Sequence, residues 1–298
     1  MRYFDATAVA ALGPAAAVDA ITDALRGDLD PAADPARIPV DLDRGQFLLM
    51  PSESDAATGV KVVTVAPDNP RRGLPRIQAS YLLFDRESLT LQAILDGTAL
   101  TTLRTPAVSL AAVRQRLPDH PVRAVVIGAG PQATGHTATL AAVHSVAQVD
   151  YLVRDPSRTS FAAVALASPQ ADDVLRAADV VVCATSARTP LFDSSLLRDE
   201  AVVVAVGSHE PDARELDAAL LARATVVVED VDAALREAGD VVLAMDENAL
   251  SAEDLVPMRD ILTGTVTIPR DRPLVFKSVG MSWQDLVVAT AVVDHHVD

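Results

Sequence analysis

Two patterns of apolar and polar positions divide this chain. In its N-terminal part, short segments alternate apolar with polar residues, as in IQASYLLFD at 77–85, and this alternation predicts strands of a sheet with one covered face. A helix is predicted before them over 14–27, with Pro14 near its start and Gly27 at its end, and a longer helix after them over 97–117. The predicted strands are 37–42, 46–50, 59–66, 77–84 and 90–95.

The pattern changes at Pro121, after which continuously apolar segments alternate with helical ones. Such strands are typical of a parallel sheet that helices cover on both faces, so the chain is predicted to be an α/β protein with a Rossmann-type, doubly wound domain beside a β-rich one. A last helix is predicted over 282–296, in a C-terminal tail that the pattern assigns to neither part. The apolar strands are VRAVVIG (122–128), VDYLV (149–153), DVVVCAT (179–185), AVVVAVG (201–207) and ATVVVED (224–230).

Composition narrows the class of protein. Of 298 residues, 50% are hydrophobic and 22% are charged, which is ordinary for a globular protein. The net charge is −16 and no basic run is present, so nucleic-acid binding is not expected. The N-terminus does not resemble a secretory signal, no window reaches the about 18 apolar residues of a membrane span, and one cysteine, Cys183, cannot form an intramolecular disulfide. We therefore expect a soluble cytoplasmic protein. No metal site is predicted, because the adjacent His295 and His296 have no third ligand in view.

A glycine-rich turn joins the first apolar strand to the helix after it. It reads GAGPQA over 128–133, the G-x-G-x-x-A form of the dinucleotide-binding fingerprint. Gly128 permits a tight turn, Gly130 lets a pyrophosphate approach the backbone, and Ala133 lets helix and strand pack closely. A glycine turn without a ligand is the alternative, but the position between a strand and a helix favours a nicotinamide dinucleotide site.

The end of the second apolar strand bears on the choice between NAD and NADP. NAD sites commonly place Asp or Glu there, to bind the ribose 2′-hydroxyl. Here the position holds Val153, followed by Arg154, with Arg158 further along, and two guanidinium groups can clamp a 2′-phosphate. NADP(H) is therefore expected in preference to NAD(H). Asp155 argues the other way, and both arginines could instead be solvated surface charges.

Only two of the 25 basic residues are lysines, Lys61 and Lys277. A desolvated lysine can lose its proton, whereas arginine stays charged. Lys61 lies in the alternating segment GVKVVTVA, where it points either into a cleft or onto a solvated face. In a cleft, desolvation would lower the pKa of its ammonium group, which could then exchange a proton with a bound substrate near neutral pH. For Lys277, the sequence leaves a structural and a functional role equally open.

Several further motifs follow one another in a fixed order. They are MPSES (50–54), GVKVV (59–63), APDNPRRGLPRIQASYLLFD (66–85), LDGTALTTLRTPAVS (95–109), VIGAGPQA (126–133), VGSHEPDARELD (206–217), EAGDV (237–241) and VFKSVGMSWQDL (275–286). In this combination the chain resembles the ornithine cyclodeaminase and mu-crystallin family over nearly its whole length.

The resemblance implies a domain organisation. A Rossmann domain that binds NAD(P), here expected over 106–267, is inserted into a second domain that binds substrate and forms a homodimer. That second domain is expected over 1–105 and completed by 268–298.

The resemblance also implies roles for single residues. Arg37 and Lys61 match substrate-binding positions, and Arg104 matches a residue that touches both substrate and cofactor. The loop containing Gly280 is expected beside the substrate and the nicotinamide. Cofactor contacts are expected from the glycine turn and the strand ends that follow it, namely from Gly128, Gly130, Pro131, Gln132, Val153, Arg154, Arg158, Thr185, Val206, Ser278 and Val279.

One departure from the family pattern affects the expected reaction. Where cyclodeaminases carry a catalytic Asp, two residues before the proline of the GxxxP segment, this chain has His209. His209 follows an apolar strand at the carboxyl edge of the predicted sheet, so it either exchanges protons near neutral pH or only lines the pocket.

The expected activity is therefore that of an NAD(P)H-dependent reductase or dehydrogenase. Its substrate would be a small cyclic imino acid or an α-amino acid, such as a ketimine or Δ1-pyrroline-2-carboxylate, with Lys61 and His209 as catalytic candidates. One alternative is an ornithine cyclodeaminase, which is an ammonia lyase. The other is a crystallin-like protein that binds NADPH and a small ligand without turnover.

Overall fold

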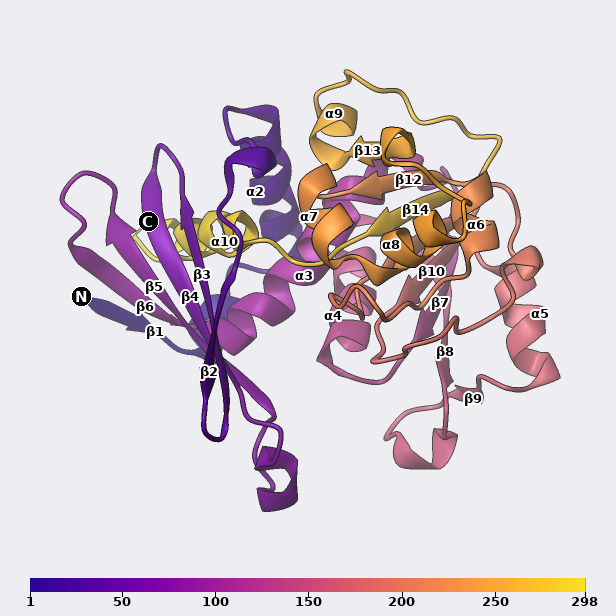
Figure 1. The fold of residues 1–298 in the computed structure, drawn as a ribbon, viewed down its shortest axis with the longest axis horizontal. Helices are drawn as coiled ribbons and strands as arrows, with labels where there is room; N and C mark the ends of the chain where they lie inside the picture. Colours follow the sequence, from indigo (N-terminus) through magenta and orange to yellow (C-terminus); the bar gives the residue numbers. More distant parts are fainter. Residues whose placement is uncertain (298) are drawn as a thin grey trace. The chain divides into compact units, whose positions relative to one another are not determined.

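The computed structural model describes residues 1–297 and divides the chain into two compact units (Figure 1). The first unit comprises Met1–Val108 and Met281–Asp298, and the second comprises Ser109–Gly280. Each unit is described below by itself.

A mixed six-stranded sheet forms the centre of the first unit, in the order β1-β6-β5-β4-β3-β2. β1 pairs with β6 in parallel, and the other neighbours are antiparallel. The strands are β1 (Arg2–Phe4), β2 (Ile38–Leu42), β3 (Gly45–Glu53), β4 (Ala57–Val65), β5 (Ile77–Asp85) and β6 (Leu91–Asp96).

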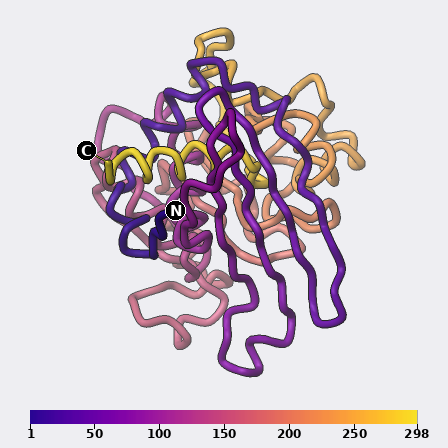
Figure 2. The backbone as a smooth tube through the Cα atoms, turned by 90° about the vertical axis from the view of Figure 1, so that its left-hand side faces the viewer, coloured from indigo at the N-terminus to yellow at the C-terminus, as the bar shows by residue number. Residues whose placement is uncertain are grey.

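Helix α10 packs on one face of this sheet, against β3, β4 and β5. The alternation that predicted these strands follows from this packing, since Gly59, Lys61 and Val63 of β4 are buried while the residues between them are half-buried. α2 packs on α10 through Val18, Ile21 and other apolar residues of one face, and in Figure 2 α10, in yellow, lies next to the N-terminal helices. The helices are α1 (Ala6–Ala10), α2 (Pro14–Arg26), α3 (Gly97–Val113), whose last residues belong to the second unit, and α10 (Ser282–His295).

The second unit is built on an eight-stranded sheet in which every neighbouring pair is parallel, in the order β13-β12-β14-β11-β10-β7-β8-β9. Val-rich strands form its centre because both of their faces are covered. The strands are β7 (Val122–Ile127), β8 (Val146–Val153), β9 (Val164–Ala165), β10 (Val180–Cys183), β11 (Val202–Ala205), β12 (Thr225–Val228), β13 (Leu255–Pro257) and β14 (Leu274–Lys277).

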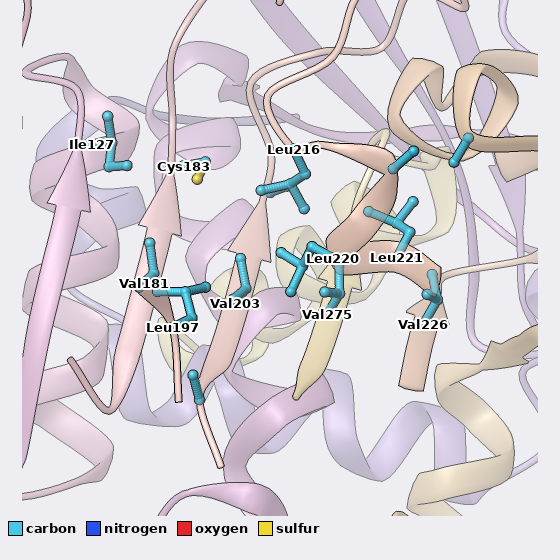
Figure 3. Close-up of a cluster of buried hydrophobic side chains, with 14 of the residues drawn as sticks. Ile127, Val181, Cys183, Leu197, Val203, Leu216, Leu220, Leu221, Val226 and Val275 are labelled. Carbon is cyan, nitrogen blue, oxygen red and sulfur yellow. The ribbon is translucent and has the colours of Figure 1, made fainter. Parts of the chain in front are cut away.

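Aliphatic side chains from several strands and helices make one core of this unit (Figure 3). Val181, Val203 and Val275 of neighbouring strands contribute to it, and Leu220 and Leu221 of α6 pack with them. The only cysteine, Cys183, is free and buried in the same cluster. The helices are α4 (Pro131–Val143), α5 (Pro169–Ala177), α6 (Ala218–Arg223), α7 (Val231–Glu237), α8 (Gly239–Asp246) and α9 (Met258–Leu262).

The predicted fold class, a Rossmann-type parallel sheet together with a β-rich second part, is confirmed. The predicted boundary at residue 268 differs from the observed division, because β14 is hydrogen-bonded between β11 and β12 and so belongs to the second unit up to Gly280. The long helix predicted over 97–117 ends at Val113, where a short 3₁₀ turn replaces it. Within residues 1–297, no helix is long and apolar enough to cross a membrane.

Candidate functional site

The glycine-rich turn has the local geometry that a dinucleotide phosphate needs. Gly128 has a φ of 128°, and a Cβ on it would lie 2.6 Å from the carbonyl oxygen of Ala184, so both conformation and space require glycine. By contrast, a Cβ on Gly130 would have no neighbour within 4 Å. The turn is therefore open on the side where a pyrophosphate approaches, and the buried Ala133 provides the close helix–strand packing. These residues fit a bound dinucleotide.

Helix α4 starts directly after the turn, with the exposed Pro131 and the half-buried Gln132 in its first turn. The positive end of a helix dipole favours an anion at this place. The buried His136 anchors the helix, because its Nδ1 lies 2.7 Å from the Gln132 carbonyl oxygen and its Nε2 lies 2.9 Å from the Ser109 hydroxyl. Burial lowers the pKa of His136 to about 4, so the neutral ring donates from Nδ1 and accepts at Nε2.

The end of β8 presents the two arginines that were predicted beside the adenosine ribose. Val153 is buried, whereas Arg154 and Arg158 are exposed. The Asp155 carboxylate accepts hydrogen bonds from the Ser157 hydroxyl at 2.6 Å and the Ser157 backbone N–H at 3.1 Å, and these bonds lower the pKa of Asp155. The Asp155 side chain therefore caps the 3₁₀ turn that follows it, Pro156–Arg158.

The loops after β10 and β11 carry three more predicted residues at the same edge of the parallel sheet. Thr185 and Val206 are half-buried and His209 is exposed. The buried carboxylate of Glu215 accepts hydrogen bonds from both loops, at Thr185 and at Gly207. Sequence reasoning missed Glu215.

The segment after β14 is held by a second buried carboxylate. Glu229 accepts hydrogen bonds from the Ser278 hydroxyl at 2.7 Å, from the Val279 N–H at 2.8 Å and from the Gly280 N–H at 3.2 Å. Ser278 and Gly280 are buried and Val279 is half-buried. Lys277, which precedes them, is fully buried and forms an ion pair with Asp240, which gives this lysine a structural role.

Lys61 lies at the centre of a buried charged cluster in the first unit. Its Nζ donates a hydrogen bond to Asp285 Oδ2 of α10 at 2.6 Å, and both side chains are almost fully buried. Burial lowers the pKa of Lys61 from 10.5 to about 8; the positive charges of Arg104 and Arg37 add to this, while Asp285 opposes it. The ammonium group is therefore poised to give up its proton near neutral pH.

The two predicted carboxylate-binding arginines belong to this cluster. Arg104 of α3 is 5% exposed, donates a hydrogen bond to the Gln284 side chain, and has its Nε 3.3 Å from Asp285 Oδ1. Arg37, just before β2, is half-buried and close enough to influence the charge of Lys61. The structure thus brings Lys61 and Arg104 together around Asp285, with Arg37 near enough to act on Lys61.

Two further titratable groups border the cluster. Tyr81 pairs with Lys61 across β4 and β5, and a Cβ on Gly59 would lie 2.1 Å from the Tyr81 hydroxyl, so the phenol fills the space that this glycine leaves. Asp34 accepts hydrogen bonds from the Ser52 hydroxyl at 2.6 Å and the Trp283 N–H at 3.0 Å. These hydrogen bonds lower the pKa of Asp34, but burial has the larger effect and raises it to about 6.

Sequence reasoning did not identify the buried partners of the predicted residues. Asp285, Glu215 and Glu229 are buried carboxylates that hold predicted site residues. A signal was present, since SWQDL places Gln284 and Asp285 at the start of a mainly apolar helix, and a buried acidic residue usually has a partner. Across residues 1–297 no group of three or more His, Cys, Asp or Glu side chains is arranged to hold a metal ion.

The second unit is thus a Rossmann-type dinucleotide-binding fold, and comparison with known proteins identifies the family. A sequence profile of the ornithine cyclodeaminase/mu-crystallin family matches residues 8–298. The ketimine reductase mu-crystallin of Mus musculus is 33% identical over 268 residues, covering 86% of this chain and 82% of that protein. The Δ1-pyrroline-2-carboxylate/Δ1-piperideine-2-carboxylate reductase of Azospirillum brasilense is 33% identical over 285 residues, covering 92% and 88%. The chain belongs to the ornithine cyclodeaminase/mu-crystallin family, as its motifs predicted.

A solved structure supports the same fold. The Δ1-pyrroline-2-carboxylate reductase of Thermococcus litoralis, in complex with NADH and L-proline, matches with a TM-score of 0.89 and 24% identity, covering 100% of this chain and 98% of that one. The activity expected from the sequence, an NAD(P)H-dependent imine reductase, agrees with the activities for which the two 33%-identical relatives are named.

Proposed function

We propose that this protein reduces the C=N bond of a small cyclic α-imino acid with NAD(P)H. The observation that carries the proposal is the buried cluster of Lys61 and Arg104 around Asp285, with the half-buried Arg37 acting on Lys61, in a chain that also has a dinucleotide turn open at Gly130. The relatives named as ketimine and Δ1-pyrroline-2-carboxylate reductases support the same reaction class.

The chemistry divides between the cofactor and the side chains. Bound NAD(P)H supplies a hydride to the imine carbon. The Arg37 and Arg104 guanidinium groups hold the substrate carboxylate, for which a planar fork of donors is well suited. The Lys61 ammonium group donates the proton that the ring nitrogen gains, so that the imine becomes a secondary amine and Lys61 is left neutral until it is reprotonated. His209, exposed on the loop after β11, is the second candidate for the group that supplies this proton.

The test is cofactor consumption with defined substrates. Purified protein should oxidise NADPH or NADH with Δ1-pyrroline-2-carboxylate or Δ1-piperideine-2-carboxylate, giving proline or pipecolate. Formation of proline and ammonia from ornithine, without net consumption of cofactor, would instead assign a cyclodeaminase. Tight cofactor binding with no turnover of any imine would assign a binding protein.

We propose NADP(H) as the preferred cofactor. Arg154 and Arg158 are exposed at the end of β8, and the competing Asp155 is occupied by Ser157. Replacing Arg154 or Arg158 with Ala should raise KM for NADPH about tenfold and leave KM for NADH nearly unchanged, because only NADPH carries the 2′-phosphate. An equal effect on both cofactors would contradict this preference.

We also propose a homodimer formed through the face of the six-stranded sheet that α10 does not cover. Phe47 and Leu49 of β3, Val60 and Val62 of β4, and Leu82 of β5 are half-buried on that face. At the edge of the sheet, Ile38 and Val40 of β2 are 50% and 40% exposed. A continuous apolar face of this kind marks an interaction surface. Light scattering should give twice the 31.3 kDa mass of one chain; a single-chain mass at micromolar concentration would contradict it.

We further propose a cytoplasmic location, which the single, free and buried Cys183 supports. Fractionation of cells that produce the full chain should recover it with the cytoplasmic proteins, and recovery in an exported fraction would contradict this.

A further inference from the structure

A buried charged network lies beneath the carboxyl ends of the strands in the second unit. It consists of Glu215, Asp240 and Lys277, which are at most 1% exposed. Burying charged groups is costly unless each is paired, and replacing them by apolar residues is often neutral for stability. A network of this kind therefore needs an explanation beyond the stability of the unit.

Glu215 joins the loops that follow two neighbouring parallel strands. Its Oε1 accepts from the Thr185 N–H at 2.8 Å and the Thr185 hydroxyl at 2.7 Å, and its Oε2 accepts from the Gly207 N–H at 2.8 Å. The fit is close, because a Cβ on Gly207 would lie 2.4 Å from Glu215 Oε1 and 2.0 Å from the Thr185 carbonyl oxygen. One carboxylate thus fixes the distance between the two loops.

Asp240 and Lys277 hold Glu215 and its neighbourhood in place. Asp240 Oδ1 accepts from the backbone N–H groups of Glu215 at 2.7 Å and Leu216 at 2.8 Å. Its Oδ2 lies 2.9 Å from Lys277 Nζ, which also donates to the Ser208 carbonyl oxygen at 2.7 Å. The residue before His209 is therefore tied to the same network.

We propose that Glu215 is a positioning residue for the nicotinamide cofactor. Through Thr185 and Gly207 it sets the shape of the loops that carry the expected cofactor contacts, while Asp240, paired with Lys277, holds the backbone of Glu215 in place. The carboxyl ends of parallel strands are where such folds bind their ligands, so a shift of these loops changes cofactor binding. This inference rests on the proposed function, since it assumes that the chain binds NAD(P)H.

The substitution Glu215→Gln tests the inference. An amide can accept at one atom only, and its NH₂ group would face an N–H donor at Thr185 or Gly207, so the two loops must move apart. NADPH titration followed by fluorescence should give a dissociation constant at least about tenfold higher than for the unchanged chain. The KM for the imino acid should stay the same, which separates cofactor positioning from a general loss of structure.

Asp217→Asn is the matched control. Asp217 accepts a comparable set of hydrogen bonds, from the Ser194 N–H at 3.0 Å, the Ser194 hydroxyl at 2.7 Å and the Leu220 N–H at 2.8 Å, but it contacts none of the predicted cofactor residues in those bonds. It should lower thermal stability without changing the dissociation constant for NADPH.

The outcomes separate two failures. If the unchanged chain does not bind NADPH or NADH, the proposed function is wrong. If it binds NADPH and a folded Glu215→Gln variant binds equally tightly, the positioning role is wrong. Should Glu215→Gln not fold, Thr185→Val removes one donor to the same carboxylate and should still weaken NADPH binding about threefold; unchanged binding in that variant would overturn the proposal.

Discussion

At the scale of single residues, opposing effects at Lys61 control the proposed chemistry. Burial and the nearby Arg104 and Arg37 disfavour its charged form, while Asp285 favours it. The result is a pKa of about 8 for Lys61, below the ordinary 10.5. A lysine in this state can donate a proton at neutral pH and accept one at slightly higher pH.

The rates of imine reduction and of amino-acid oxidation should therefore change in opposite ways with pH. Imine reduction needs the protonated lysine, so its kcat/KM should fall as the pH rises through about 8. Oxidation of the amino acid needs the neutral lysine and should rise over the same range. Lys61→Met, which can do neither, should lose at least about 100-fold in kcat while still binding NADPH. A flat profile in both directions would remove Lys61 from the mechanism.

Asp285 should affect both the free energy of unfolding of the chain and the pKa of Lys61. Asp285→Asn leaves Lys61 and Arg104 buried without their countercharge, so the free energy of unfolding should fall by about 3–5 kcal/mol. The pKa of Lys61 should drop below about 8, which moves the loss of reductase activity to lower pH. Urea unfolding and a pH profile measure the two effects. Asp294→Asn, at an exposed position of the same helix, is the control and should change stability by less than about 0.5 kcal/mol.

These residues also show what the sequence could predict. Lys61 was predicted as a site residue because lysine is rare in this chain and this one stands in an alternating strand, and Arg37 and Arg104 were predicted from the family resemblance. Asp285 lies 224 residues from Lys61, so no local pattern connects them. Only the packing of α10 on β4 brings them together.

At the scale of elements, the spacing of hydrophobic residues predicted most strands and helices, but it did not predict the order of the strands in the sheets. Continuous apolar runs predicted β7, β10, β11 and β12. The apolar run of β14 has only three residues, Leu274–Phe276, before the charged Lys277. The strand lies between β11 and β12, and the parallel pairing that places it there is non-local. α4 starts where it was predicted because a glycine turn precedes it and Pro131 is its first residue.

The anchoring of α4 by His136 predicts a dependence of stability on pH. The pKa of His136 is about 4 in the folded chain and 6.5 ordinarily, so the unfolded chain binds this proton more tightly. The free energy of unfolding should decrease as the pH falls from 6.5 to about 4, by up to about 3 kcal/mol. Urea unfolding at several pH values measures the slope.

His136→Gln should remove most of this slope, since glutamine does not titrate. His144→Gln, at the C-cap of the same helix, should retain it. If His136→Gln keeps the full slope, other groups cause the acid sensitivity and the buried imidazole is not the reason for it.

At the scale of the whole molecule, each chain carries a net charge of −16, while its six-stranded sheet leaves an apolar face uncovered by α10. When two chains meet through this face, the burial of apolar surface stabilises the dimer and the repulsion between the two negative chains destabilises it. Salt screens the repulsion, so the proposed dimer should become tighter as ionic strength rises.

A single charge on the apolar face should shift this balance toward the monomer. Val62 of β4 lies opposite Leu49 and Ser80 on the face away from α10, so Val62→Glu would place a carboxylate inside the proposed contact, where it has no partner. The expected result is a mass near one chain by light scattering and a dissociation constant at least about 100-fold higher.

Leu89→Glu is the control, because Leu89 is 61% exposed in the turn between β5 and β6 and carries the same change of charge. It should remain dimeric, which separates a local effect of the sheet face from the general effect of a more negative chain. Circular dichroism must show both variants folded. If Val62→Glu stays a dimer at all salt concentrations, the contact between chains lies elsewhere, and the apolar face of the sheet must be explained by a different partner.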